Sequence, residues 1–313
     1  MKLGNLAELD APTRGRIDAA CNFINHKVAE LRRRVTTVGV VTFGTALIVW
    51  LASGIDVRVP FVAAFAITFL TFAHANRGLA KWYKTMVVRR VVEAVGTGLT
   101  YDRESSFTRD QFKNIDLFNS RVDVWKSEDQ ISGQRNEIDY ALHEIRAARR
   151  EKRGKQTVEV VVFKGHIVIL EFNKNFLGHT VVVPDREGKI LGGLFGDADS
   201  RRSKRLISLG NADFENKYSV YASDDQEANY LLTPKLMELI LSACARLGCE
   251  LRLAFYQNSL YVTVPSDQDR FEVSMFGGKV TPQSVVGDLA SVVALAEQLI
   301  DTLDLETRIW TRT

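Results

Sequence analysis

The residues whose types and spacing could support chemistry are few. Asp224, Glu227 and Tyr230 form a small polar group at helical spacing, and a carboxylate pair beside a phenol is the kind of set that can move protons. The same pattern has a structural interpretation, because an acid followed three residues later by Glu is typical of a helix start. The sequence leaves both interpretations open, and we keep these three residues as a candidate polar site.

Histidines and cysteines give little further support for catalysis. Three cysteines occur without a Cys-x-x-Cys pair, which argues against a disulfide framework and for a reducing compartment. Cys244 and Cys249 flank the expected end of a helix, and a metal there would need more ligands nearby. The nucleophile elbow, the zinc-protease motif, the phosphate-binding loop and the dinucleotide fingerprint are all missing from the sequence. We therefore expect no metal and no cofactor, and we regard an enzyme as uncertain and the less favoured class.

Two long uncharged runs dominate the first quarter of the chain. Residues 35–55 carry no charge over about 20 residues, and a second uncharged run of about 18 covers residues 59–76. Soluble helices usually keep a polar stripe, and neither run has one. The alternative, a buried hairpin in a soluble core, is disfavoured for that reason. The sequence predicts two membrane-spanning helices joined by a short loop.

The charges flanking these runs predict the orientation of the hairpin. Lysine and arginine collect on the cytoplasmic side of membrane helices, so we expect both termini to be cytoplasmic. Neither run has an ionisable residue near its middle, which favours an anchor over a conduit. Small residues at i, i+4 predict close packing of the two spans. These residues are Thr42 with Ala46, and Ala64 with Thr68.

Helices are expected on both sides of the hairpin. Apolar residues from Ile17 to Leu31 repeat at three- and four-residue spacing, and this stripe predicts a helix that runs into the first span without a break. A second amphipathic helix is predicted from Gly78 to Val95 and ends at Gly96 and Gly98. We expect the two helices to pack on each other.

The rest of the chain predicts an α+β domain with antiparallel sheet. Residues 99–135 are irregular and predict short helices and loops. Strands are expected at 138–142, 158–163, 167–172 and 180–183, with Lys164-Gly165 as a tight turn between the second and the third. Further short strands are expected at 206–209 and 218–221, followed by a helix that Asp224 caps. Thr233-Pro234 should start a helix that Gly248 stops, a hairpin should cover 251–264, and Thr281-Pro282 should open a last long helix.

Clustered bases are the clearest candidates for contacts. The net charge is only +3, so there is no global footprint for nucleic acid, and we expect none to bind. A basic hairpin tip is predicted between residues 146 and 155; a solvated loop is the plainer interpretation, and contact with lipid head groups or an acidic partner is the functional one. The candidate membrane or partner contacts are Arg32, Arg33, Arg34, Lys81, Lys84, Arg89, Arg90, Arg149, Arg150, Lys152, Arg153, Arg201, Arg202, Lys204 and Arg205.

Several segments of the domain resemble a known family. They cover residues 162–165, 171–176, 180–185, 218–234, 260–265 and 307–310, and the most specific is the run from Val220-Tyr221 through Asp224 and Glu227-Ala228 to Leu232-Thr233-Pro234. These segments are similar to those of the bacterial membrane-protein family catalogued as domain of unknown function 3137. The likeness extends over most of residues 85–313. It implies a bacterial inner-membrane protein and supplies no catalytic residues.

These observations predict a membrane α-helical hairpin followed by a cytoplasmic α+β domain. The expected divisions are a cytoplasmic amphipathic helix (1–34), the hairpin (35–76), a basic juxtamembrane helix (77–98) and the domain (99–313), with a further boundary near 185–205. We expect an interaction or regulatory module that contacts the bilayer and a protein partner, with a homo-oligomer left open. A membrane-bound enzyme is the alternative.

Overall fold

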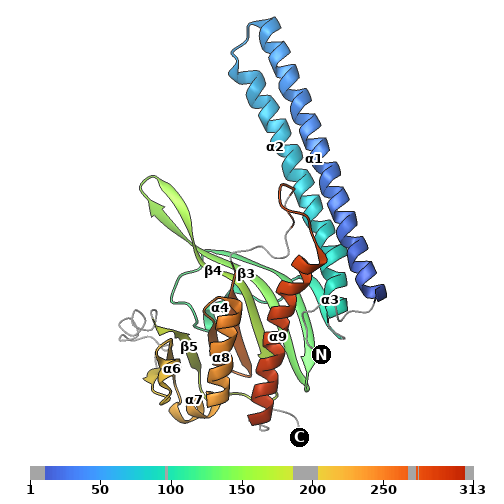
Figure 1. The fold of residues 1–313 in the computed structure, drawn as a ribbon. Coiled ribbons are helices and arrows are strands. Elements are labelled where there is room, and N and C mark those ends of the chain that lie inside the picture. Colours follow the sequence, from blue (N-terminus) through green and yellow to red (C-terminus); the bar gives the residue numbers. More distant parts are fainter. Residues whose placement is uncertain (1–10, 96–97, 186–203, 267–272, 274, 307–313) are drawn as a thin grey trace. The chain divides into compact units, whose positions relative to one another are not determined.

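The computed structural model describes residues 11–95, 98–185, 204–266, 273 and 275–306. The chain divides into two compact units (Figure 1). The helical unit comprises Asn5–Val95 with Arg270–Asp288. The sheet unit comprises Gly96–Asp269 with Leu289–Thr313 and the four N-terminal residues. This division differs from the expected one, because a late segment, 270–288, groups with the N-terminal helices and not with the domain that surrounds it in sequence.

The helical unit is built on two long antiparallel helices, α1 (Ala11–Ser53) and α2 (Arg58–Tyr83). α1 is continuous from the amphipathic segment into the first uncharged run, as predicted. The helices meet at small residues: Ala46 and Ala64 are buried, and the hydroxyls of Thr42 and Thr68 are 3.1 Å apart across the pair. The predicted close packing of these four residues is confirmed.

Beyond the second run, α2 continues through one π-helical segment, η2 (Lys84–Val88), into α3 (Arg89–Val95). Val87, Val88 and Val91 on this stretch are fully buried, and so is Ile24 on α1. Both η2 and α3 contact α1. The apolar stripe that precedes the first run therefore packs on the helix that follows the second, as expected.

The sheet unit contains one nine-stranded antiparallel sheet in the order β1-β2-β3-β4-β9-β8-β5-β7-β6. The antiparallel α+β prediction is confirmed for this unit. The strands are β1 (Thr100–Glu104), β2 (Val124–Arg135), β3 (Ile138–Arg153), β4 (Gln156–Glu171), β5 (Thr180–Pro184), β6 (Arg205–Ile207), β7 (Tyr218–Ala222), β8 (Arg252–Tyr256) and β9 (Ser259–Pro265).

Both faces of the central strands are buried. On one face, Phe163 and Ile167 of β4 join the core formed by the segment that carries α4 (Arg109–Asn114), including Phe112. Side chains alternate along a strand, so Val168 and Leu170 belong to the opposite face, and both are fully buried. α8 (Pro234–Leu247) and the later part of α9 (Pro282–Glu306) cover that opposite face (Figure 1). Burial on both sides explains why β4 is almost continuously apolar here.

α9 is fixed to the sheet by an ion cluster at the end of β2. The guanidinium of Arg135 donates two hydrogen bonds of 2.6 Å to the carboxylate of Asp301 and a third, of 3.2 Å, to Glu297. Tyr140 on β3 also donates to Glu297, at 3.4 Å. Two parallel bonds to one carboxylate set the orientation of the helix as well as adding stability.

Two predictions for the first half of the sheet are wrong. Lys164-Gly165 is not a turn, because β4 runs without interruption from Gln156 to Glu171 and the hairpin turns at Gly154. Gly165 is needed inside the strand for a different reason: a Cβ atom there would lie 2.2 Å from the carbonyl oxygen of Val264 on β9. Residues 99–135, expected to hold only short helices and loops, contain β1 and β2 besides α4.

α6 (Ala212–Glu215), before β7, was not predicted. The helices expected after it are confirmed. α7 (Asp225–Leu231) follows β7, and Asp224 caps it by accepting the backbone N–H of Glu227. Thr233 caps α8, with Pro234 in its first turn, and Gly248 ends it in the left-handed conformation at φ 65°. The hairpin of β8 and β9 is confirmed as well.

Candidate functional site

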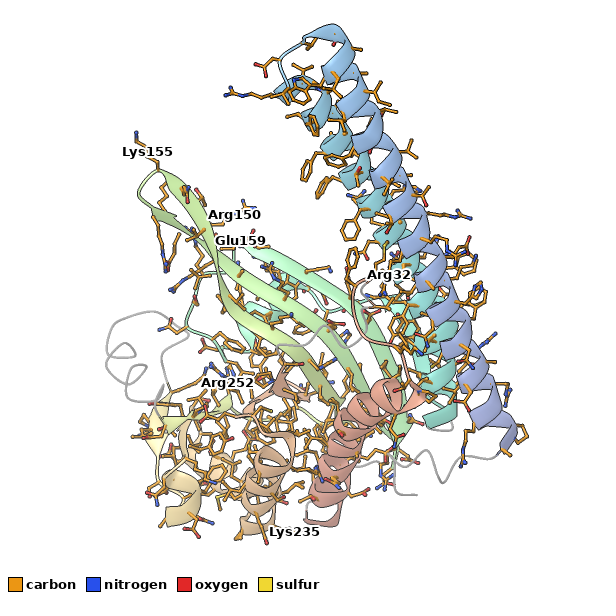
Figure 2. The ribbon with its side chains drawn as sticks, turned by 45° about the horizontal axis from the view of Figure 1, so that its top comes forward. Arg32, Arg150, Lys155, Glu159, Lys235 and Arg252 are labelled. Carbon is orange, nitrogen blue, oxygen red and sulfur yellow. The ribbon has the colours of Figure 1, made fainter. Side chains whose placement is uncertain are left out.

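The outer part of the β3–β4 hairpin, residues 149–162, is an exposed and highly charged element of the sheet unit, and we call it the ribbon. β2 pairs with β3 only as far as Ala148, and β9 pairs with β4 only from Gly165 onward. Within the described chain, the two strands of the ribbon therefore pair only with each other. Figure 2 shows Arg150 and Glu159 along this extension and Lys155 at its tip.

Bases outnumber acids on the ribbon, and its acids are already engaged. Glu151 forms ion pairs with Arg149 at 2.7 Å and Arg153 at 3.7 Å, and Glu159 pairs with Arg146 at 3.0 Å. Exposed ion pairs of this kind contribute little stability. These pairs engage both acids of the ribbon, while the side chains of Arg150, Lys152 and Lys155 remain exposed.

The ribbon also offers backbone groups. Along Gln156–Phe163 the edge of β4 that faces away from β3 has no strand partner among the described residues. Such an edge presents free N–H and C=O groups to which an extended chain can add. Val161 on this stretch is 52% exposed, which gives an incoming strand an apolar contact. A base-rich strand edge of this kind suits an extended segment with acidic side chains.

The predicted bases of the helical unit have different environments. Arg33, Lys81, Arg89 and Arg90 are exposed, as a contact surface requires. Lys84 is only 5% exposed, so it does not belong to that surface. Arg34 pairs with Glu30 at 2.5 Å within α1. The side chain of Arg32 donates to the backbone carbonyl of Met275, more than 240 residues later in the chain.

The last predicted basic cluster is only partly described. Arg201 and Arg202 lie outside the described residues. Arg205 is exposed and lies 3.4 Å from Asp225.

Lys204 is placed differently from the expectation. Its side chain is 5% exposed and its ammonium group pairs with Asp116 at 2.6 Å. Burial lowers the pKa of Lys204, while the bond to Asp116 opposes that shift. Nearby, burial and then the charge of Lys204 lower the pKa of His179 to about 3, which keeps its imidazole neutral. A buried, paired lysine is a packing element and not a contact for lipid or a partner.

In the candidate polar site of Asp224, Glu227 and Tyr230, the two carboxylates have structural roles. The side chain of Asp224 caps α7. Glu227 is 7% exposed, and its two carboxylate oxygens accept the backbone N–H groups of Leu177 and Gly178, each at 2.7 Å. Tyr230 is 41% exposed. The carboxylate thus holds the loop that precedes β5.

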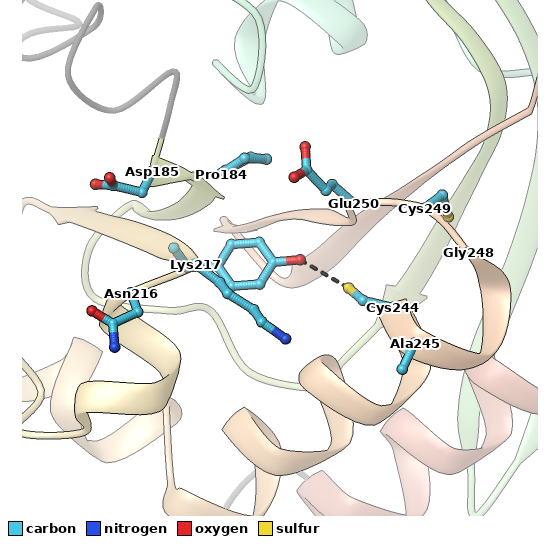
Figure 3. A pocket seen from close by; sticks show the side chains of 10 residues that line it. Pro184, Asp185, Asn216, Lys217, Cys244, Ala245, Gly248, Cys249 and Glu250 are labelled. Atoms are coloured by element: carbon cyan, nitrogen blue, oxygen red, sulfur yellow. Dashed lines mark hydrogen bonds between the residues drawn. The ribbon is translucent and has the colours of Figure 1, made fainter.

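Sequence reasoning missed a cavity of about 750 Å³ beside β7 and the end of α8 (Figure 3). Its lining comes from three separate segments: Pro184 and Asp185, Asn216 to Tyr218, and Cys244 and Ala245 with Gly248 to Glu250. The hydroxyl of Tyr218 lies 2.9 Å from the thiol sulfur of Cys244. Burial and this bond raise the pKa of Tyr218, so the phenol stays protonated. The sequence places Cys244 and Cys249 at the end of a helix but does not indicate the cavity, because its three lining segments are far apart in the chain.

Chemistry at this cavity is limited by what surrounds it. Asp185 accepts a hydrogen bond from Ser219 at 2.9 Å, and neither Cys244 nor Cys249 is in a disulfide. The described residues contain no group of three or more His, Cys, Asp and Glu side chains that could hold a metal ion. The cavity has room for a small molecule.

The architecture defines a class: a long apolar helical hairpin attached to an antiparallel α+β sheet unit with an extended basic ribbon. Residues 161–305 match the model of the family described as "Protein of unknown function (DUF3137)". The resemblance drawn from the sequence is therefore confirmed over that span, which is narrower than the likeness first suggested.

Comparison with known proteins adds one structure. A solved chain, the crystal structure of the mycobacterial trehalose monomycolate transport factor A, TtfA, is similar with a TM-score of 0.39 and 13% sequence identity. The match covers 72% of this chain and 95% of that chain. The search of curated proteins found no match.

Proposed function

We propose that this chain is a membrane-anchored interaction module. In this proposal α1 and α2 cross the inner membrane of a bacterium, both termini and the sheet unit are cytoplasmic, and the ribbon binds an acidic, extended segment of a protein partner. The ribbon is the observation that carries the proposal.

The surface of the hairpin supports the anchor. α1 and α2 are long and apolar enough to cross a membrane, and only 11% and 6% of their most apolar 18-residue stretches are buried. Large side chains such as Val40, Leu51 and Leu70 are 66–70% exposed. Soluble proteins rarely leave so wide an apolar surface in water, whereas lipid covers it at no cost. The exposed bases Arg33, Lys81, Arg89 and Arg90 at one end favour cytoplasmic termini.

The ribbon supports the interaction role because it combines three features. Its bases are exposed, its acids form ion pairs with neighbouring arginines, and the outer edge of β4 has no strand partner among the described residues. Strand addition uses backbone bonds for affinity and side-chain charge for selectivity. A bilayer surface would use only the charge. The free edge therefore favours a protein segment over lipid as the occupant.

A membrane-bound enzyme is the alternative function, and the cavity beside Tyr218 and Cys244 is the observation in its favour. The residues first considered for catalysis, Asp224 and Glu227, lie in structural hydrogen bonds instead. The interaction module accounts for more of the exposed features of the sheet unit.

Site-specific photo-cross-linking in native membranes tests the proposal. A benzophenone amino acid replaces Lys152 on the ribbon or, as the matched control, Lys235, an exposed base at the start of α8 (Figure 2). We expect discrete protein adducts from position 152 and none from position 235. The adducts should weaken in about 0.5 M salt, where charge interactions are screened within about 4 Å.

Charge-reversed variants sharpen the result. Arg150→Glu combined with Arg153→Glu should abolish the adducts from position 152, while Lys235→Glu should leave them unchanged. Lipid adducts alone would overturn the protein partner in favour of the leaflet. Equal labelling at positions 152 and 235 would show that the ribbon is not a specific contact site and would overturn its proposed role.

A further inference from the structure

A loop from the late part of the chain is bound to the helical hairpin. Residues 275–280, which we call the Phe276 loop, precede α9 and belong to the helical unit. The guanidinium of Arg32 donates to the carbonyl of Met275 from Nε at 3.1 Å and from Nη2 at 2.7 Å. The side-chain amide of Asn25 both donates to the carbonyl of Val280, at 2.8 Å, and accepts its N–H, at 2.9 Å. The two ends of the loop are thus fixed to α1.

Between these two attachments the loop presents an aromatic ring. The ring of Phe276 stacks on that of Phe72 in α2, with centroids 5.7 Å apart and an interplanar angle of 24°. The guanidinium carbon of Arg32 lies 6.0 Å from the centroid of the same ring. Despite both contacts, Phe276 is 67% exposed. The ring therefore extends the exposed apolar surface of α1 and α2, and contiguous apolar surface of this kind marks a contact site.

The two contacts also place the ring along the hairpin. Arg32 lies just before the first uncharged run, and Phe72 lies inside the second. Phe72 precedes Arg77 by about one and a half helical turns, or about 7 Å. That depth corresponds to the boundary between head groups and acyl chains, where aromatic side chains and arginine concentrate.

The sequence of the loop suits such a position. Phe276 is followed by Gly277 and Gly278, which add no polar side chain, and then by Lys279, which is exposed. The loop thus has an apolar ring at its turn, Phe276, and a charged side chain near its end, Lys279. The exposed apolar side chains of α1 and α2 continue directly into the ring of Phe276 through Phe72.

We propose that the Phe276 loop is a third membrane contact, in which Phe276 inserts into the cytoplasmic leaflet at the head-group boundary and Arg32 fixes the loop at that depth. The occupant of the exposed ring face is phospholipid. The inference rests on the proposed function only in that α1 and α2 must cross the bilayer. It gives the Phe276 loop a membrane role that its sequence alone does not suggest.

Spin-label accessibility of the full chain in phosphatidylcholine–phosphatidylglycerol vesicles tests the inference. The native cysteines are replaced (Cys21→Ala, Cys244→Ser, Cys249→Ser), and a nitroxide is placed by Phe276→Cys. Ile48→Cys in α1, where Ile48 is 65% exposed, is the matched lipid reference. Asp18→Cys is the aqueous reference, because it lies about 25 Å before the first uncharged run along α1. Collisions with oxygen report lipid, and collisions with a nickel chelate report water.

We expect the oxygen-to-nickel ratio at position 276 to exceed that at position 18 several-fold and to approach that at position 48. Asn25→Ala, which releases one end of the loop, should lower the ratio at 276 and leave the ratio at 48 unchanged. An aqueous ratio at 276 with a lipid ratio at 48 would overturn this inference and leave the anchor standing. An aqueous ratio at 48 would overturn the anchor itself. Low collision with both agents at 276 would show protein contact, such as a second copy, and would also overturn the inference.

Discussion

Two long hairpins, one of helices and one of strands, have opposite surfaces. In the pair α1–α2, small residues meet inside and the exposed side chains are apolar. In the outer part of β3–β4 the exposed side chains are mostly charged, and the two strands form strand pairs only with each other among the described residues. Each hairpin turns tightly, at Gly54 and at Gly154, both with positive φ.

The difference shows which medium each hairpin requires. Neither one encloses a core of its own in its exposed part, so neither can be stable through burial within the chain alone. Helices satisfy their backbone groups internally, so an apolar exterior suits them to lipid. In the ribbon, the outer edge of β4 has no strand partner among the described residues, and only water or another chain can satisfy its backbone groups. In each hairpin the exposed side chains and the backbone groups therefore suit the same surroundings: lipid for α1–α2, and water or another chain for the ribbon.

The largest expected effect comes from placing the same charge on each hairpin. Ile67 in α2 and Val161 on the ribbon are similarly exposed, at 50% and 52%. Ile67→Asp should oppose membrane insertion by about 3 kcal/mol, while Val161→Asp should leave insertion unchanged. Alkaline extraction of membranes measures the fraction that stays inserted. Equal retention of both variants would contradict the contrast drawn between the two surfaces.

The second prediction concerns two glycines of β4 and its turn. Gly165→Ala should destabilise the sheet unit by about 3 kcal/mol, because strained backbone of this kind costs 1–3 kcal/mol and the new Cβ would also meet the carbonyl of Val264. Gly154→Ala at the turn, where a Cβ meets nothing within 4 Å, should cost about 1 kcal/mol. Thermal unfolding of the full chain in detergent compares the two variants. A larger effect at Gly154 would show that the turn, and not the approach to β9, limits the strand.

A pH effect is expected from the buried part of the β3–β4 hairpin. Burial lowers the pKa of His143 from 6.5 to about 4. The folded chain thus keeps this histidine neutral while the unfolded chain takes up a proton below pH 6.5. The resulting stability is complete above pH 6.5 and is lost as the pH falls toward 4, by about 1 kcal/mol per pH unit.

Chemical unfolding at pH 7.5 and pH 5 measures this loss. His143→Asn, which keeps a polar group near the hydroxyl of Ser105 that now lies 2.8 Å from Nδ1, should show a smaller loss between the two pH values. The neighbourhood of His179 contributes equally to both proteins and cancels in the comparison. An identical pH dependence in the variant would contradict the assignment.

The smallest effect is expected inside the helical hairpin. Thr42→Val removes the hydroxyl that lies 3.1 Å from that of Thr68 and should weaken the helix pair by about 0.6 kcal/mol, a typical value for such bonds in membranes. Thr45→Val is the control, because Thr45 donates to the carbonyl of Thr42 on its own helix. Unfolding in mixed micelles, with a rising fraction of a denaturing detergent, measures the stability of the helix pair in both variants. A larger loss for Thr45→Val would place the stabilising contact elsewhere.

The sequence correctly predicted the elements that depend on residues close together in the chain. The long uncharged runs, the cap at Thr233 with Pro234 and the stop at Gly248 each depend on neighbouring residues, and α1, α2 and α8 follow them. β2 was missed because it is partly exposed along its length, and only its pairing with β3 shows that it is a strand.

Long-range contacts account for the errors. Lys164-Gly165 has the composition of a turn, and only the approach of β9, about 100 residues later, requires the glycine within a strand. Lys204 belongs to a basic stretch, but its partner Asp116 is 88 residues away, so its burial could not be predicted. The cavity likewise joins three distant segments.

The grouping of residues 270–288 with the N-terminal helices has a practical consequence. The polypeptide leaves the helical unit after Val95, returns to it at Arg270 and leaves again after Asp288. A truncated protein starting at Gly96 would therefore lose Asn25, Arg32 and Phe72, the binding partners of Met275, Phe276 and Val280. Truncation there would expose the Phe276 loop to water without the helices that bind it, and the loop would then favour aggregation. Because the helical unit is formed by two separate segments of the chain, a single truncation cannot remove all of it.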